Sequence, residues 1–148
     1  MSTAFEKIIA GEWPGRFVWA DGECVVFATI EPITSGHVLV VPRHPYPSWT
    51  DCPEDLVAHL MVVARTIALA QQRAFHVERS GLVIAGLEVP HTHLHVVPMR
   101  SEADIAFANA SPATDVALDT AMGLLREALV EDGQGAHVPP TMSSADLA

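Results

Sequence analysis

Apolar residues recur along the chain with two periods, one of three to four residues and one of two, which predict helices and strands respectively. The expected elements are a helix over 4–10, strands over 16–20, 24–30 and 37–41, a helix that begins just after residue 51 and runs to about 75, strands over 82–87 and 91–98, and a helix over 116–129. Several strands follow one another without an intervening helix. The pattern therefore predicts an α+β fold with a largely antiparallel sheet.

The longest of these helices has the clearest pattern. Its apolar positions recur every three or four residues, at Leu56, Leu60, Val63, Ile67, Ala70 and Ala74. Asp51 and Glu54 have the spacing of a capping box, and Pro53 suits a first helical turn. We expect one apolar stripe of this helix to cover the sheet.

Residues that favour turns divide the rest of the chain. Asp21-Gly22-Glu23 separates two β-type runs and is typical of a hairpin turn between antiparallel strands. The segment 132–148 contains glycines, prolines and serines without an apolar period, which predicts a mobile tail. The remaining residues, 1–131, are expected to form a single domain.

Composition narrows the class of protein. The 148 residues include 8 Lys and Arg against 18 Asp and Glu, a net charge of −10, and 49% of them are hydrophobic. This composition is that of a globular chain, and the absence of a basic cluster makes a long nucleic acid a poor candidate partner. No apolar run reaches the length of a membrane span. Cys24 and Cys52 form no CxxC motif, so we expect a cytoplasmic protein without a disulfide framework.

Histidines gather in two places along the sequence. His37 and His44 flank the third predicted strand, whereas His91, His93 and His95 alternate along the last one. Alternate residues of a strand share a face, so these three imidazoles are expected to project from one face, about 6 to 7 Å apart. Crowded imidazoles repel one another as cations, and the pKa of at least one ring is expected to fall until that ring is neutral near pH 7.

Three interpretations of this patch remain open from the residues alone. The first is a solvated, histidine-rich strand. The second is a metal site in which neighbouring imidazoles share one ion, and the third is a site of covalent phosphoryl chemistry. The apolar Leu94, Val96 and Val97 place the strand within a core sheet and count against the first interpretation. In the third, a neutral imidazole attacks phosphorus while its neighbours hold the phosphate oxygens.

Three ordered segments resemble the histidine-triad (HIT) family. The segment His91-Thr92-His93-Leu94-His95-Val96-Val97 is similar to the family's alternation of three histidines with hydrophobic residues, apart from Thr at one hydrophobic place. The segment 27–42, ending in Gly36-His37-Val38-Leu39-Val40-Val41-Pro42, and the segment 5–12 are similar to two further stretches of the family. The resemblance covers residues 3 to about 100.

The resemblance implies a HIT-like fold with a five-stranded sheet, a homodimer, and a nucleotide hydrolase or transferase that acts at the α-phosphate. His93 would be the nucleophile, His91 and His95 would orient it and contact phosphate oxygens, and His37 would support the site. The ligand would be a purine nucleotide or nucleotide conjugate, with no cofactor. Phe5, Ile8, Phe27 and Ile30 match positions that enclose the base, and Gly86 matches a glycine that lets a phosphate approach the backbone.

The chain departs from the family pattern at several positions. Thr3 and Glu6 replace the CxxC of the zinc-bearing branch, so no structural zinc is expected at that place. Thr29 and Ser80 occupy positions that usually contact ribose. Gly86-Leu87-Glu88 replaces a segment that ends in a hydroxyl residue, so that Glu88 either points away from the substrate or protonates a leaving amine.

These observations favour an enzyme that cleaves a nucleoside monophosphate conjugate through a nucleotidyl-histidine intermediate. Few cations are available to hold a long polyphosphate, so a phosphoramidate is preferred to a dinucleoside polyphosphate. A nucleotide-binding or interaction module without turnover is the alternative, followed by a metal-dependent hydrolase.

Overall fold

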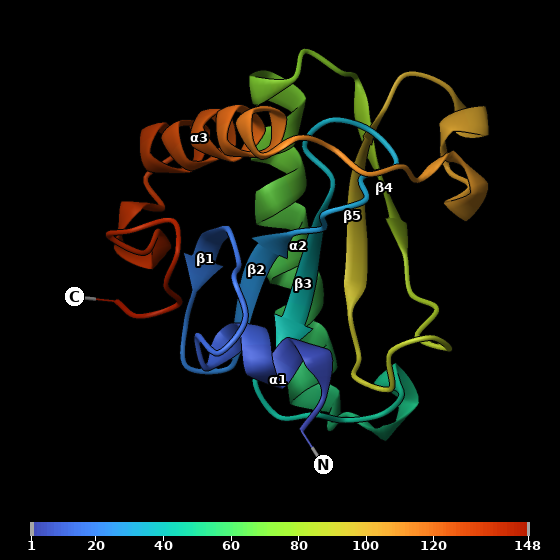
Figure 1. Ribbon diagram of the computed structural model, residues 1–148, viewed down its shortest axis with the longest axis vertical. Coiled ribbons are helices and arrows are strands. Elements are labelled where there is room, and N and C mark those ends of the chain that lie inside the picture. The colour runs from blue at the N-terminus through green and yellow to red at the C-terminus, as the bar shows by residue number, and fades with distance from the viewer. Residues whose placement is uncertain (1, 148) are drawn as a thin grey trace.

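The computed structural model describes residues 2–147, and the first residue of the predicted domain and the last of the predicted tail lie outside this range. Five strands form one antiparallel sheet in the order β1-β2-β3-β5-β4 (Figure 1). The strands are β1 (Phe17–Ala20), β2 (Cys24–Ala28), β3 (Val38–Pro42), β4 (Arg79–Val83) and β5 (Leu94–Met99), and the helices are α1 (Ala4–Ile9), α2 (Glu54–Ala74) and α3 (Asp115–Glu131). The α+β prediction is confirmed.

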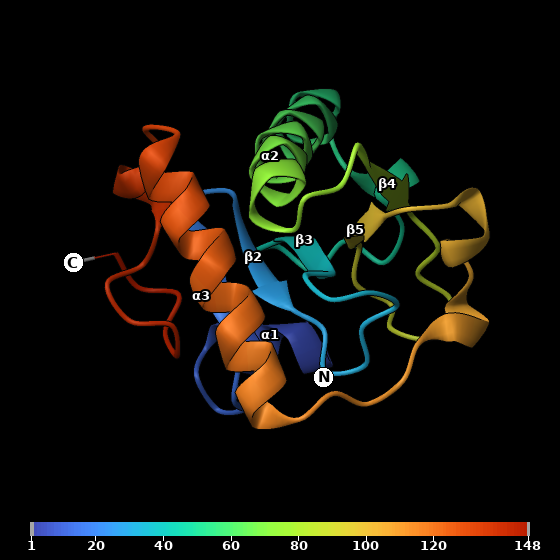
Figure 2. The same ribbon diagram turned by 90° about the horizontal axis from the view of Figure 1, so that it is seen from above.

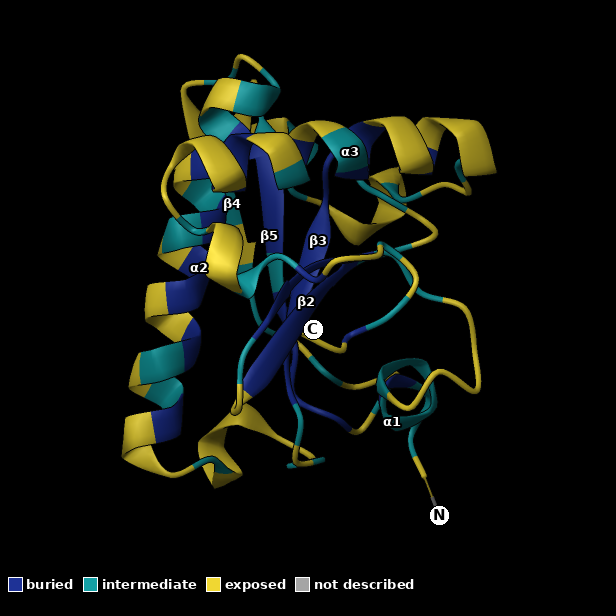
Figure 3. Ribbon diagram, turned by 90° about the vertical axis from the view of Figure 1, so that its left-hand side faces the viewer, coloured by how far each residue is buried: buried dark blue, intermediate teal, exposed yellow. Residues whose placement is uncertain are grey.

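Helices cover the two faces of the sheet unequally. The stripe of α2 and the apolar side of α3 pack on one face, while the shorter α1 packs on the other (Figure 2). The central strands are buried between these layers (Figure 3). Burial on both faces explains why β3 is a continuous apolar run rather than an alternating one. Within residues 2–147, no helix has both the length and the apolar character needed to cross a membrane.

The β1–β2 hairpin forms where the sequence predicts it. The Asp21 carboxylate oxygen Oδ1 accepts hydrogen bonds from the backbone N–H groups of Glu23 and Cys24, each 2.8 Å away. The side chain thereby satisfies backbone donors in the turn, as Asp commonly does in such turns. The Asp21 side chain therefore fixes the position at which β2 begins.

Several boundaries differ from the prediction, including the end of β2, which lies at Ala28 rather than at residue 30. Asp51 belongs to a capping box with Ser48 around the short 3₁₀ helix Trp49–Asp51, and Pro53 precedes α2 without a side-chain cap, so the predicted Asp51–Glu54 box is wrong. Strand β4 covers Arg79–Val83 rather than 82–87, because its partners run from Met99 to His95 on β5. Strand β5 begins at Leu94 rather than at the predicted residue 91, so the loop after β4 continues to residue 93 and includes His91 and His93.

The C-terminal segment predicted to be a mobile tail lies against the domain. The backbone carbonyl of Met142 accepts the N–H of Phe17 at 2.7 Å, at the outer edge of β1. Arg126 of α3 donates to the carbonyl oxygens of Phe17 and Pro139. Ala145 is buried beside α1. The residues that make these contacts are irregularly spaced, so the sequence shows no apolar period in this segment.

Candidate active site

A chain of hydrogen bonds links β3 to the histidines of β5. The backbone N–H of Ile33 donates to His37 Nδ1 at 2.9 Å, so the ring proton of neutral His37 lies on Nε2. That Nε2 is 2.9 Å from His95 Nδ1 and donates to it. The proton of neutral His95 therefore lies on Nε2, which remains free to donate to a ligand. The ring contacts of His95 with both His37 and His93 place all three imidazoles together.

His93 is held by the backbone. Its Nδ1 lies 2.7 Å from the carbonyl oxygen of His91, and since a carbonyl only accepts, Nδ1 carries the proton. The lone pair of the neutral ring is consequently on Nε2. Within residues 2–147 no group forms a hydrogen bond with this nitrogen, and it is not among the atoms sealed from solvent. The ring centroid is 4.9 Å from that of His95.

The ring of His91 is turned away from this pair. It is fully buried, donates from Nε2 to the carbonyl oxygen of Pro42 at 2.7 Å, and receives the Thr3 hydroxyl at Nδ1, also at 2.7 Å. Both ring nitrogens are occupied, so the ring has no free donor for a phosphate oxygen. The expected role of His91 therefore needs correction, because it orients His93 through its carbonyl oxygen and not through its ring.

Thr3 is a part of the site that the sequence analysis missed. Its hydroxyl accepts the N–H of Glu6 at 3.1 Å, and the Glu6 carboxylate accepts the N–H of Thr3 at 2.9 Å, which forms a capping box at the start of α1. The same hydroxyl donates to His91. The capping-box spacing is visible in the sequence, whereas the contact with a residue 88 positions away is not.

Burial keeps these imidazoles uncharged. Desolvation lowers the pKa of His37 to about 3 and that of His95 to about 4, and the charge of neighbouring histidines adds a smaller effect in the same direction. Desolvation also lowers the pKa of His91 and His93, against the hydrogen bond that each donates to a carbonyl. The predicted neutral ring near pH 7 follows, but its main cause is burial rather than mutual repulsion.

Apolar and aromatic side chains form the wall beside the histidines. Phe5 makes edge-to-face contacts with His91, His93 and Phe27, at centroid distances of 5.6, 4.9 and 5.6 Å. Ile8 packs in the same cluster. Phe107 was missed by the sequence analysis, because it lies in a stretch without apolar periodicity, yet its half-exposed ring is 5.0 Å from His95.

The remaining predicted ligand residues differ in how far they are exposed. Ile30, Leu87 and Glu88 are exposed, Leu87 almost completely. Thr29 is half-buried at the end of β2, where its hydroxyl accepts the Glu31 N–H at 3.3 Å. Gly86 adopts a φ of +82° with open space where a side chain would project, which suits a close backbone approach.

Ser80 lies on the wrong face of the sheet for the predicted ribose contact. It pairs with Pro98 on β5, so its side chain points to the face covered by α2. There its hydroxyl donates to Gln71 Oε1 at 2.7 Å. The histidine rings occupy the opposite face, and Ser80 is therefore a packing residue.

Four imidazoles with assigned tautomers, those of His37, His91, His93 and His95, thus gather beside an aromatic wall on an antiparallel sheet. A family model described as the HIT domain matches residues 10–102. The chain belongs to the HIT family.

Relatives cover most of the chain. An uncharacterized HIT-like protein of Methanocaldococcus jannaschii is 34% identical over 78% of this chain and 92% of its own length. The adenylylsulfatase of Arabidopsis thaliana is 31% identical over 72% of this chain and 56% of its own length. The adenosine 5'-monophosphoramidase of Saccharomyces cerevisiae is 30% identical, with 66% and 63% covered. A crystal structure of a zinc-bound histidine triad family protein from Mycobacterium smegmatis is 30% identical, covers 91% of this chain and 98% of its own, and has a TM-score of 0.79.

Proposed function

We propose that the protein cleaves a nucleoside monophosphate conjugate at its α-phosphate through a covalent nucleotidyl-His93 intermediate. The observation that carries the proposal is the hydrogen bond from His93 Nδ1 to the His91 carbonyl oxygen, which leaves the Nε2 lone pair free beside a donor on His95. A nucleophile needs such a lone pair, and the lowered pKa of His93 keeps it available at neutral pH.

The reaction has two steps. His93 Nε2 attacks the α-phosphorus and a nitrogen–phosphorus bond forms, while the bond to the leaving group breaks; the leaving group keeps the electron pair and takes up a proton from solvent. Water then attacks the same phosphorus and gives a proton to solvent, the nitrogen–phosphorus bond breaks with its electron pair returning to Nε2, and the nucleoside monophosphate leaves a neutral ring. During both steps the Nε2–H of His95 donates to a non-bridging oxygen, where charge develops.

The hydrogen bonds around His95 support this assignment of the donor. Its tautomer is fixed by His37, whose own tautomer is fixed by the backbone N–H of Ile33. An oriented donor in a desolvated site needs no reorganisation when charge develops, and removing one typically lowers kcat about 100- to 1000-fold. His37 thus acts as a positioning residue.

A phosphoramidate is the preferred substrate class, with a purine nucleoside as the other part. The half-exposed Phe107 ring beside His95 offers an aromatic surface for the base, while the buried Phe5 ring packs on His93 and Phe27. A net charge of −10 disfavours a long polyphosphate. The names of the Arabidopsis and yeast relatives, an adenylylsulfatase and a monophosphoramidase, also point to short leaving groups on an adenylyl moiety.

Incubation with adenosine 5'-phosphoramidate tests the proposal. We expect release of AMP that persists in EDTA, with loss of turnover in His93→Ala. A trapped AMP adduct, detected by mass spectrometry in wild type and missing in His93→Ala, identifies the nucleophile. Binding of AMP without turnover would instead support the interaction module, and loss of turnover in EDTA would support a metal-dependent hydrolase.

A homodimer formed at β4 is part of the proposal. Strand β4 is an edge of the sheet, and within residues 2–147 no segment pairs with its outer side. Leu82 on this strand and Met61 on α2 are exposed apolar side chains, 39% and 49% accessible. An open strand edge that carries an exposed apolar side chain favours pairing with a second copy. Both cysteines are free, which fits the proposed reducing, cytoplasmic location.

A further inference from the structure

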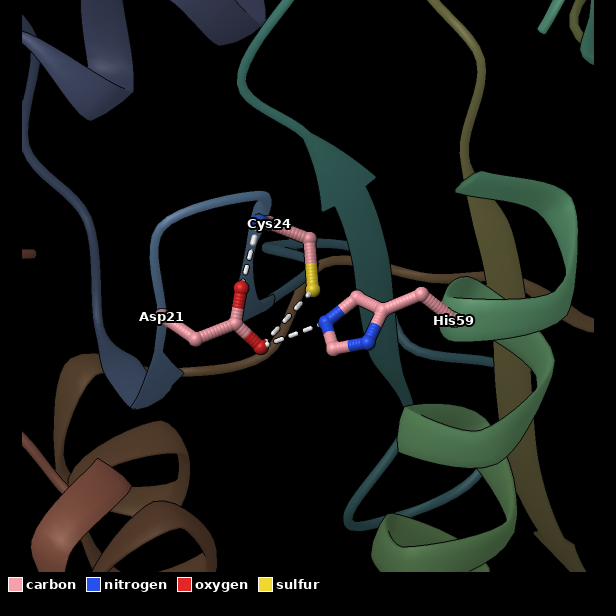
Figure 4. Close-up of side chains that lie close together, drawn as sticks. All are labelled: Asp21, Cys24 and His59. Carbon is pink, nitrogen blue, oxygen red and sulfur yellow. Dashed lines mark hydrogen bonds and ion pairs between the residues drawn. The ribbon is translucent and has the colours of Figure 1, made fainter. Parts of the chain in front are cut away.

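A second cluster of reactive side chains lies on the face of the sheet opposite to the histidine rings. Asp21 comes from the β1–β2 turn, Cys24 from the start of β2, and His59 from α2 (Figure 4). Their carboxylate, thiol and imidazole atoms all lie within 4.8 Å of one another. Asp21 Oδ2 is 2.8 Å from His59 Nε2 and 3.6 Å from Cys24 Sγ. The proposed phosphoryl chemistry uses none of these groups.

The carboxylate in this cluster is oriented by groups outside it. Asp21 Oδ1 accepts the backbone N–H groups of Glu23 and Cys24, and Trp19 Nε1 donates to Oδ2 at 2.8 Å. Burial alone would raise the pKa of Asp21, but these hydrogen bonds and that of His59 lower it to about 2. Metal-binding carboxylates are characteristically fixed by such outer hydrogen bonds. Trp19 and the two backbone N–H groups thus hold the orientation of the carboxylate independently of the Cys24 and His59 side chains.

The donor set and its spacing suit a zinc ion. Thiolate, imidazole and carboxylate are the usual zinc ligands, and bonds of about 2.0 to 2.3 Å place tetrahedral ligands roughly 3.2 to 3.8 Å apart. The separations in the cluster, from 2.8 Å to at most 4.8 Å, bracket this range. Only small side-chain shifts would bring the three atoms to a common centre.

The position of the cluster allows an ion to enter. Cys24 is buried and the Asp21 side chain is 11% exposed, whereas the His59 side chain is 37% exposed. A cavity of about 410 Å³ lies beside it, with Gly22, Glu23 and His59 in its lining. This cavity offers room for a water molecule as a fourth ligand.

We propose that Asp21, Cys24 and His59 form a zinc-binding site with one ligand position open to this cavity. On binding, the Cys24 thiol proton passes to solvent and a sulfur–zinc bond forms, while the proton that His59 Nε2 now donates to Asp21 leaves that nitrogen and its lone pair binds the ion. The ion would tie the β1–β2 hairpin to α2 in place of the present hydrogen bonds. This inference does not depend on the proposed function.

Titration of the metal-free full-length protein with Co²⁺ and Zn²⁺ tests the site. We expect one ion per chain, a thiolate-to-cobalt charge-transfer band that Zn²⁺ removes by displacement, and a higher Tm in Zn²⁺. His59→Gln should lose the band and the Tm increase. Because the His59 side chain is partly exposed, this variant should still fold. Circular dichroism checks that the variant is folded.

Three further variants locate the ion. Cys52→Ser should keep the charge-transfer band, because this cysteine lies outside the cluster, and Cys24→Ser should lose it. If Cys24→Ser does not fold, the band of the Cys52→Ser protein, which retains Cys24 as its one cysteine, assigns the thiolate. His44→Gln should bind as wild type does. An absent band, a band unaffected by His59→Gln, or one lost in His44→Gln would overturn the proposal.

Discussion

His93 donates its Nδ1 proton to the carbonyl oxygen of His91, 2.7 Å away along the same chain. The His91 ring is in turn anchored by Pro42 and Thr3, so the position of that carbonyl depends on contacts with β3 and α1. The orientation of the proposed nucleophile is thereby set by a residue whose own ring nitrogens are both occupied by other groups. Changes at Thr3 should therefore alter the chemical step.

Thr3→Val tests this connection. Valine keeps the shape but removes the hydroxyl, which leaves His91 Nδ1 and the Glu6 N–H without partners. We expect a lower kcat with a nearly unchanged KM, together with a loss of about 1 kcal/mol in the free energy of unfolding. Single-turnover kinetics and urea denaturation measure the two effects. Thr3→Ser restores the hydroxyl and should recover both, whereas an equal kcat in Thr3→Val and wild type would contradict the positioning role.

Acid should destabilise the protein through its buried histidines. An unfolded imidazole takes up a proton near pH 6.5, whereas folded His37 and His95 do so only near pH 3 and pH 4. Between these values the unfolded chain binds more protons, so the free energy of unfolding falls as the pH falls below 6.5. The slope is up to about 1.4 kcal/mol per pH unit for each group.

Urea denaturation at several pH values between 7 and 4.5 measures this slope. His37→Gln should make it shallower, because one buried imidazole no longer contributes. His76→Asn is a suitable control, since it removes an exposed imidazole and Asn tolerates the φ of +54° found there. A slope that His37→Gln leaves unchanged would show that other groups control the acid response.

Glu88 distinguishes two interpretations of the loop before the triad. The residue is exposed and lies near the start of the histidine segment. If it protonates the leaving amine, Glu88→Gln should lower kcat for a phosphoramidate by about 100-fold or more and leave kcat for a good leaving group, such as p-nitrophenol, unchanged. We expect instead that Glu88 points away from the substrate, so that for each substrate Glu88→Gln and wild type have the same kcat. A selective loss with the amine would establish the acid role.

The proposed dimer interface is tested at Leu82. Leu82→Asp places a charge on the open edge strand next to apolar surface, where a second copy would desolvate it. Multi-angle light scattering should report a dimer for wild type and a monomer for this variant. Val116→Asp, on α3 and 76% exposed, is the matched control and should remain dimeric. A wild-type monomer at micromolar concentration would remove the interface from the proposal.

The packing of the C-terminal segment makes its own prediction. Truncation after residue 134 removes Val138, Met142 and Ala145 from the two apolar clusters of the domain. We expect a lower free energy of unfolding, by about 1 to 3 kcal/mol, and a lower Tm. Hydrogen exchange at the Phe17 N–H, which pairs with Met142, should become faster. Unchanged stability would favour the mobile tail that the composition predicts.

The sequence predicts those parts of the molecule that follow a local period. The apolar stripe of α2 and the alternation of His93 and His95 require only 3.6-residue and two-residue repeats. The roles of Ser80 and His91 could not be obtained in this way. The face that Ser80 occupies depends on its pairing with Pro98, and the ring of His91 is held by Thr3, 88 positions earlier. Such relationships are fixed by tertiary contacts.

The hydrogen bond between the Phe17 N–H and the Met142 carbonyl has a consequence for assembly. The chain's own C-terminal segment occupies part of the β1 edge, whereas within residues 2–147 nothing pairs with the outer side of β4, so a further copy adds more readily along β4. Two copies joined there about a twofold axis leave no strand margin available for a third. Assembly by strand addition would then stop at the dimer. Loss of the last dozen residues would expose the β1 edge as well, and strands could then add at both ends of the sheet to form fibres.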